Sequence, residues 1–286
     1  LLFALCLGSA GYYGYHAAEE IGEYREGEDT YQELRQYVAA PKEAFAEPPR
    51  ADFGKLSQVN PQVIGWIFAA GGEISYPVVQ GEDNEYYLNH LFNGEVNSSG
   101  SIFMDVRCEG DFSGFHSILY GHHMKNGAMF GRLNQYESQS YYEAHPSFLL
   151  ILPEETLSLE VFSAYTADVG QSAWKLDFSS AEERELWLSE LEAKSAVRCQ
   201  VSPGPEDQIV TLSTCSYEFE NARFVVHAVV RIKDFGMLHG IQGLLEERYV
   251  DLSKHIKSDL DIELLKRTPS AYLGSCRFKL PEICQD

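Results

Sequence analysis

Short apolar segments separated by turn-forming residues are the feature that most constrains how this chain folds. Between about residues 53 and 233, Gly, Asn, Asp and Pro interrupt the apolar runs at close spacing. Eight of these runs are typical of strands: VIGWIFA, ISYPVVQ, GSIFMD, FHSILYG, SFLLILP, LSLEVFSAYTA, QIVTLSTC and RFVVHAVVRI. Their number and spacing predict a mainly β fold, built as a closed barrel or a sandwich.

Three other segments have helical patterns. Residues 17–38 place apolar side chains three, four and seven positions apart among many Glu, as in an amphipathic helix. Residues 179–196 predict a helix with Ser180 as its N-cap, followed by acidic residues and then Leu186, Leu188 and Leu191. This helix is inserted just before the strand that ends at Cys215. The tail from residue 234 has helical spacing and then an irregular end.

The first fifteen residues are uncharged and mostly apolar, and the sequence begins with Leu rather than Met. A helix needs about 20 apolar residues to span a bilayer, so we expect the outer end of an N-terminal membrane helix, with three tyrosines at the interface. The end of a signal peptide and a buried helix are the alternatives. We divide the chain into a partial anchor (1–16), a helix and proline-containing linker (17–50), a β-barrel (51–233) and a C-terminal extension of unknown role (234–286).

Charge and cysteine content exclude several classes of function. The net charge is −21, from 22 basic and 43 acidic side chains, and no Lys/Arg cluster is present that could bind a phosphate backbone, so nucleic acid is excluded as a partner. The six cysteines are scattered without a C-x-x-C pair, which argues against a zinc site. We expect no metal and no cofactor. Whether Cys276 and Cys284 form a disulfide stays open.

One cysteine and one arginine lie at the ends of consecutive predicted strands. Cys215 ends QIVTLSTC, and Arg223 begins the next strand after a short loop. If these strands are antiparallel neighbours, both residues lie at one rim of the barrel. Arg223 is then placed to stabilise a thiolate or an oxyanion. The alternatives are a small buried cysteine and a surface ion pair of Arg223 with Glu218 or Glu220.

The segment LYGHHM supplies a candidate base. Its strand is expected to end at Tyr120, and Gly121 then turns the chain into His122 and His123. Histidines at a barrel rim are placed for acid–base chemistry, although a solvated surface turn is the alternative. His116, His122 and His123 are not expected to bind a metal, because no carboxylate accompanies them at a recognised spacing.

The order LYGHHM, TLSTC and ARFVVHA resembles the sortase family of cysteine transpeptidases. NPQVIGWI, YPVVQ, DNEYYLNH and GSIFMD, with the inserted helix, are similar to class B sortases over about residues 17–233. The resemblance implies an eight-stranded closed barrel, with Cys215 as nucleophile, His122 as general acid/base and Arg223 as the oxyanion-stabilising arginine; His123 falls outside the motif. It also implies five residues that line the substrate groove: Asn84, Leu88, Tyr120, Ser213 and Thr214.

The resemblance further implies a reaction and its partners. Cys215 would cleave an NPQTN-like sorting motif of a secreted protein through a thioester, and an amine of peptidoglycan or its lipid-linked precursor would resolve it. The protein would then be a monomer in the cell membrane, single-pass, with its catalytic domain on the extracellular face. A cysteine endopeptidase that releases its thioester to water and a non-catalytic β-barrel binding module remain alternatives.

Overall fold

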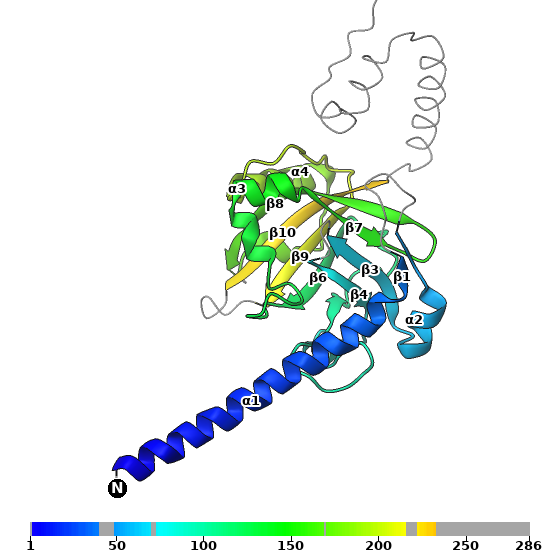
Figure 1. The fold of residues 1–286 in the computed structure, drawn as a ribbon. Coiled ribbons are helices and arrows are strands. Elements are labelled where there is room, and N and C mark those ends of the chain that lie inside the picture. The colour runs from blue at the N-terminus through cyan, green and yellow to red at the C-terminus, as the bar shows by residue number, and fades with distance from the viewer. Residues whose placement is uncertain (1, 40–48, 70–72, 169, 216–221, 233–286) are drawn as a thin grey trace, which may run out of the picture. The chain divides into compact units, whose positions relative to one another are not determined.

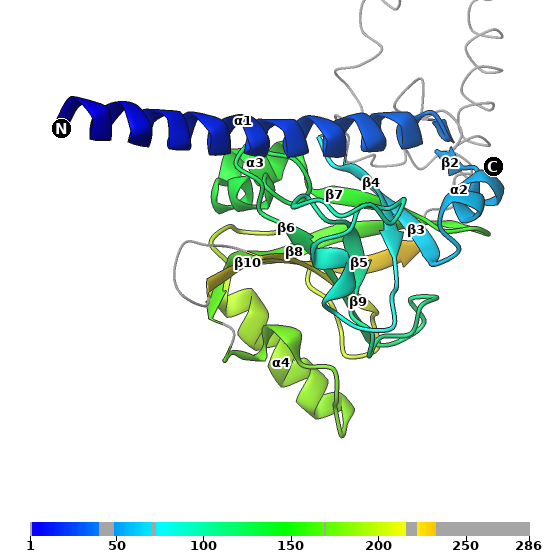
Figure 2. The same cartoon turned by 90° about the horizontal axis from the view of Figure 1, so that it is seen from below.

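Eight strands close into a barrel in a computed structural model that describes residues 2–39, 49–69, 73–168, 170–215 and 222–232. Hydrogen-bonded neighbours follow the order β10-β8-β7-β3-β4-β5-β6-β9, and the last strand pairs with the first (Figures 1 and 2). The strands are β3 (Val63–Ala69), β4 (Ser75–Val79), β5 (Ile102–Met104), β6 (His116–His122), β7 (Ser147–Ile151), β8 (Thr156–Asp168), β9 (Ile209–Cys215) and β10 (Ala222–Ile232). The predicted mainly β fold with an eight-stranded closed barrel is therefore confirmed.

Two of the strand pairs are parallel, and one of them contains β6, the strand that carries His116 and His122. β4 pairs with β5 and β6 pairs with β9 in parallel, whereas the other neighbours are antiparallel. Parallel pairing places the carboxyl ends of β6 and β9 at the same end of the barrel. The long segment between β6 and β9 returns the chain to the end of the barrel at which β9 begins.

Alternation of side chains along the strands separates two apolar clusters. On β6, Leu119 belongs to the main core inside the barrel. His116 points to the other face, where its ring lies 4.8 Å from that of Trp187 in the helix α4 (Ala181–Lys194). A smaller cluster, which includes Trp187, Leu188 and Leu191, packs α4 against this outer face.

The helix α4 confirms the predicted insertion before the cysteine strand. Its N-cap is Ser180, whose hydroxyl accepts the Glu183 N–H at 3.3 Å, as expected. The predicted apolar face is wrong in one residue, because the side chain of Leu186 is 74% exposed and Trp187 is buried instead. The remaining short elements are α2 (Phe53–Val59), α3 (Gln139–Ala144), η1 (Tyr86–Leu88), η2 (Leu133–Glu137), η3 (Ser172–Trp174) and the two-residue strands β1 (Val38–Ala39) and β2 (Arg50–Ala51).

The N-terminal helix α1 (Leu2–Arg35) is held at its C-terminal end by polar contacts. Tyr31 is buried, and its hydroxyl donates to the carbonyl of Gly100. Arg35 donates to the carbonyl of Ser75 at 3.3 Å. Farther up the helix, the carbonyl of Glu23 accepts from the Asn97 side chain at 3.0 Å. The predicted N-terminal helix thus packs on the barrel, and it runs further toward the N-terminus than the 17–38 periodicity indicated.

The expected membrane anchor is wrong. Among the helices of the described residues, none combines the length and apolar character that crossing a membrane requires. Helix α1 has 34 residues, but its apolar part is short, because acidic side chains follow from Glu19 onward. The single-pass membrane localisation that depended on residues 1–16 is therefore corrected. The predicted linker lies mostly outside the described residues, as does the whole predicted C-terminal helix.

Candidate active site

The parallel pair β6–β9 brings the predicted histidine and cysteine together at the backbone level. The register runs from His116 opposite Ile209 to His122 opposite Cys215, where both strands end. On the other side of β9, the strand β10 is antiparallel, with Val225 opposite Ser213. This confirms that the strands ending at Cys215 and containing Arg223 are antiparallel neighbours. The Cys215 side chain and residues 216–221 lie outside the described part of the chain.

His122 is half-buried, and its orientation is set by a backbone carbonyl. Its ring Nε2 lies 2.6 Å from the carbonyl oxygen of Leu88 in η1. A carbonyl only accepts, so Nε2 carries a hydrogen and donates. The neighbouring His123 forms an isolated β-bridge with Met129 beyond the end of β6. The predicted groove residue Leu88 therefore contacts His122, and it does so with its backbone carbonyl and not with its side chain.

A cavity of about 560 Å³ lies beside His122. The first turn beyond β6 supplies one wall and helix α1 supplies another, and the lining residues are Glu23, Tyr24, Ser98, His122, His123, Met124 and Lys125. The carboxylate of Glu23 accepts a hydrogen bond from Ser98 at 2.6 Å. A volume of this size is in the range of pockets that bind small-molecule ligands.

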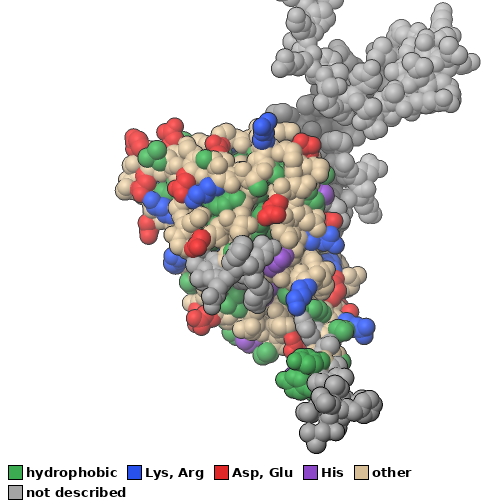
Figure 3. Space-filling view, turned by 90° about the vertical axis from the view of Figure 1, so that its left-hand side faces the viewer, with side chains coloured by type: hydrophobic (Ala, Val, Ile, Leu, Met, Phe, Trp, Pro, Cys, Tyr) green, Lys and Arg blue, Asp and Glu red, His purple; other side chains and the backbone are tan. Residues whose placement is uncertain are grey.

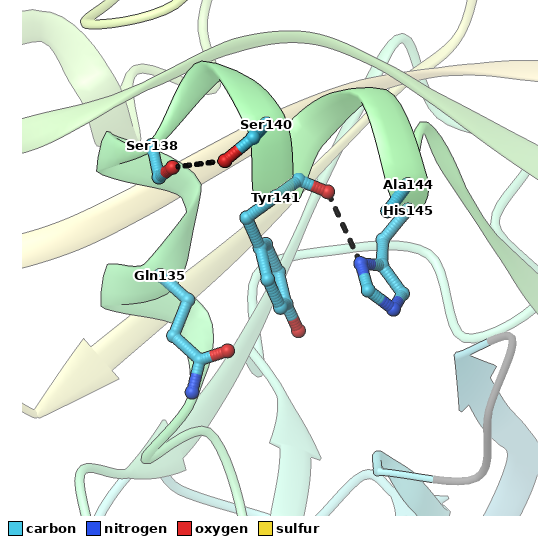
Figure 4. A pocket seen from close by; sticks show the side chains of 6 residues that line it. All are labelled: Gln135, Ser138, Ser140, Tyr141, Ala144 and His145. Atoms are coloured by element: carbon cyan, nitrogen blue, oxygen red, sulfur yellow. Dashed lines mark hydrogen bonds between the residues drawn. The ribbon is translucent and has the colours of Figure 1, made fainter.

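A second cavity has no connection with the predicted residues. It has a volume of about 470 Å³ and is lined by residues of η2 and α3 (Figure 4). Its polar groups bond locally, since the Nδ1 of His145 lies 3.1 Å from the Tyr141 carbonyl oxygen and the hydroxyls of Ser138 and Ser140 lie 2.9 Å apart. It offers no nucleophile–base pair, so the end of β6 and β9 is the better candidate site.

Tyr120 and Ser213 are cross-strand partners two residues before His122 and Cys215. The Tyr120 hydroxyl donates to Asp105 at 3.0 Å. The Ser213 hydroxyl accepts from the indole Nε1 of Trp174 at 3.1 Å. These two side chains therefore lie on one face of the sheet, directly beside the His122 position, and each is held by a neighbour that the sequence analysis did not select.

Asn84 and Thr214, the other predicted groove residues, form hydrogen bonds with backbone groups, and so does Arg223. The carbonyl of the Asn84 side chain accepts the Val106 N–H at 2.9 Å. Thr214 is buried, and its hydroxyl accepts the Phe224 N–H at 3.0 Å, so it holds the ends of β9 and β10 together. Arg223 is partly buried on β10 and donates to the Ala222 carbonyl at 3.1 Å.

Asp105 is the main site residue that sequence reasoning missed. Its side chain is completely buried at the end of β5, beside Arg107. Burial raises its pKa, but hydrogen bonds from Arg107, Asn84 and Tyr120 outweigh this effect and lower the pKa to about 2. The signal in the sequence was an Asp that ends the otherwise apolar GSIFMD. For Trp174 the sequence carried no comparable signal.

One face of the molecule carries charges of both signs. On the face in Figure 3, acidic and basic side chains are interspersed, so the net charge of −21 does not form a single negative field there. Within the described residues, no group of three or more His, Cys, Asp or Glu side chains has a geometry that could hold a metal ion.

Comparison with known proteins identifies the family. The family described as "Sortase domain" matches residues 69–231. The chain is 34% identical over 220 residues to Sortase B of Staphylococcus aureus, covering 76% of this chain and 90% of that one. It is 32% identical over 179 residues to Sortase B of Listeria monocytogenes, covering 62% and 73%. The solved Staphylococcus aureus sortase B–substrate complex superposes with a TM-score of 0.66 at 33% identity, covering 73% of this chain and 98% of that one. This chain therefore belongs to the sortase family and is a class B sortase, a cysteine transpeptidase.

Proposed function

We propose that residues 51–233 form a catalytic barrel in which Cys215 is the nucleophile and His122 the general acid/base. The observation that carries this proposal is the in-register parallel pairing of His122 with Cys215 at the ends of β6 and β9. Neighbouring strands lie about 4.8 Å apart, so a thiol and an imidazole at paired positions are within reach of proton transfer. Alternative positions for the base, such as His123, lie beyond the paired part of the strand.

Arg223 is the proposed cation of the site. The β9–β10 register has Val225 opposite Ser213, and the same register continued by two residues places position 223 opposite position 215. A guanidinium keeps its charge at any working pH and presents several N–H donors to a developing oxyanion. Arg223 would thus stabilise the tetrahedral intermediates without taking part in proton transfer.

The proposed substrate is a secreted protein with a sorting motif similar to NPQTN. The thiolate of Cys215 attacks the threonine carbonyl, the C–N bond breaks, and protonated His122 gives its proton to the leaving amine, which leaves a thioester. Because the Leu88 carbonyl accepts the Nε2 hydrogen of His122, Nδ1 is the nitrogen that gains and loses this proton. Asn84, Leu88, Tyr120 and Ser213 would line the groove, next to Trp174.

The second half-reaction needs an amine rather than water. An amine of peptidoglycan or its lipid-linked precursor attacks the thioester carbon, His122 takes the amine proton, and the thiolate leaves. The 560 Å³ cavity beside His122 supports this step, because it gives a large second substrate access to the base. The product anchors the secreted protein to the cell wall.

The test uses the full chain with a labelled peptide that contains NPQTN, with and without triglycine as the acceptor. We expect triglycine to appear in the product mass, and Cys215→Ala to abolish both cleavage and the covalent enzyme adduct. Cys199→Ala is the control, since Cys199 is a partly buried free cysteine away from the ends of β6 and β9, and it should keep the activity.

Two results would decide against the proposal. Cleavage without any incorporation of amine, across acceptors of different length, would favour the cysteine endopeptidase that releases its thioester to water. Unchanged activity of Cys215→Ala would instead favour a β-barrel whose role is binding.

A further inference from the structure

A fully buried carboxylate lies directly behind the proposed groove. The Asp105 side chain has 0% exposure, whereas its ion-pair partner Arg107 is 59% exposed. The Arg107 guanidinium donates to both carboxylate oxygens, at 2.9 Å to Oδ1 and 2.7 Å to Oδ2. The backbone N–H of Arg107 also donates to Oδ1, at 3.0 Å. Burying a carboxylate is costly, and a surface ion pair with Arg107 would have avoided that cost. The buried position therefore calls for an explanation beyond the ion pair.

The inward side of Asp105 contacts two proposed groove residues. The Tyr120 hydroxyl lies 3.0 Å from Oδ2, and Asn84 also hydrogen bonds to the carboxylate. Asn84 is fixed a second time, because its side-chain oxygen accepts the Val106 N–H at 2.9 Å. One carboxylate thus holds two side chains: that of Asn84, which precedes η1, and that of Tyr120 on β6.

The charge of Asp105 determines the direction of these hydrogen bonds. With its pKa near 2, Asp105 is ionised at any pH at which the enzyme works, and an ionised carboxylate only accepts. The Tyr120 hydroxyl must therefore donate its only hydrogen to Asp105. Burial raises the pKa of Tyr120, so the phenol keeps this hydrogen. The lone pairs of the Tyr120 oxygen are then left to accept a hydrogen bond.

We propose that Asp105 is a positioning residue that makes the Tyr120 oxygen a hydrogen-bond acceptor for an N–H donor of the sorting peptide. This inference rests on the proposed function, because it takes Tyr120 to line the groove. Tyr120 is two residues from His122 on the same face of β6, so a peptide seated at the base passes this oxygen. The carboxamide side chains of an NPQTN-like motif are donors of the required chemistry.

The test compares Asp105→Asn, Tyr120→Phe and the double variant in steady-state cleavage of the NPQTN peptide. In Asp105→Asn the amide N–H donates to the Tyr120 oxygen. The hydrogen bond between the two side chains is then reversed, and the Tyr120 hydroxyl hydrogen turns toward the groove. We expect KM to rise about tenfold in each single variant, the loss typical of one hydrogen bond, with kcat changed less than twofold. The double variant should be no worse than Tyr120→Phe, because Asp105 acts through Tyr120.

Peptide preference separates positioning from a purely structural role. In one peptide the glutamine carboxamide of the motif is replaced by a carboxylate, and in a second peptide the asparagine carboxamide is replaced in the same way. We expect the wild type to reject at least one of them, and both single variants to lose the same discrimination. A variant that is only less stable would lower the rates with all peptides equally.

Asp207→Asn is the matched control. Asp207 forms the same kind of two-point pair with Arg231, at 2.6 Å and 3.2 Å, and contacts no proposed groove residue. It should leave KM and the peptide preference unchanged. Wild-type KM and preference in Asp105→Asn, or multiplicative losses in the double variant, would overturn the inference. A wild-type enzyme that consumes no peptide would instead overturn the proposed function.

Discussion

At the scale of single residues, Gly121 shows how closely the barrel is packed behind the candidate base. The sequence suggested a turn at Gly121, but β6 continues through His122. A Cβ at this position would lie 2.4 Å from Cδ1 of Ile102 and 2.8 Å from the Phe130 ring. Glycine therefore fits the contact of β6 with the core, and a larger side chain must push aside Ile102 and the Phe130 ring or shift the strand end that carries His122.

We expect Gly121→Ala to lower the free energy of unfolding by about 1–3 kcal/mol and to reduce kcat/KM, because overpacking shifts His122. Chemical denaturation and peptide cleavage measure the two effects. Gly22→Ala is the control, since a Cβ there meets nothing within 4 Å and lies in α1, where alanine should stabilise by about 0.5–1 kcal/mol. Wild-type stability of Gly121→Ala would contradict the packing argument.

At the scale of elements, a buried hydrogen-bond chain connects β6, β9 and β10. His116 Nδ1 lies 2.7 Å from the Lys175 carbonyl oxygen, and its Nε2 lies 2.6 Å from the Thr211 hydroxyl. The same hydroxyl lies 2.7 Å from His227 Nδ1. Burial lowers the pKa of both rings and keeps them neutral. Because the Lys175 carbonyl only accepts, His116 Nδ1 donates to it, the Thr211 hydroxyl donates to His116 Nε2, and His227 Nδ1 donates to the Thr211 oxygen. These hydrogen bonds tie β6, β9 and β10 together.

The two buried histidines of this hydrogen-bond network predict that the protein loses stability at mildly acidic pH. Burial lowers the pKa of His116 from 6.5 to about 4 and that of His227 well below its usual value. Between pH 6.5 and 4 the unfolded chain therefore binds more protons than the folded protein, so stability falls as pH falls through this window. We expect a decrease of about 3–5 kcal/mol from pH 7 to 4.5 in denaturation experiments, because each of the two rings contributes about 1.4 kcal/mol per pH unit.

The matched variants for this prediction are His116→Gln and His16→Gln. The first removes one buried titrating ring and should make stability depend less steeply on pH. The second removes an exposed histidine of α1 and should keep the wild-type slope. Equal slopes in all three proteins would show that the loss comes from other groups.

At the scale of the whole molecule, the described barrel is complete before the C-terminal extension begins. Residues Leu1–Lys233 form one compact unit. Within it, β10 pairs with both β8 and β9 and closes the barrel, and it ends at Ile232. The proposed catalytic residues all lie inside this unit.

We therefore expect a chain that ends at Lys233 to fold and to cleave the sorting peptide. Its thermal midpoint should lie within a few degrees of that of the full chain, and its kcat/KM within about twofold. A chain that ends at His227 is the control, because it removes half of β10 and should not fold. A large loss of kcat/KM on removal of residues 234–286 would assign them a part in catalysis.

Much of the site was predictable because its signals are local. Short apolar runs separated by turn-forming residues marked the strands, and the cap at Ser180 marked α4. The partners of the site residues were not predictable in this way. The Leu88 carbonyl binds His122 and the Trp174 indole holds Ser213, and both are contacts between segments far apart in the chain.

The sequence by itself determined the β class, the strand segments, the inserted helix and the residue types that sortase chemistry needs, because periodicity, capping and motif order are read along the chain. Only the tertiary structure decided that β6 and β9 are parallel neighbours, that Asp105 is buried against Tyr120, and that α1 provides no membrane-crossing helix among the described residues. Strand pairing and the burial of a charge depend on which distant segments meet, and that is settled by closing the barrel and filling its core.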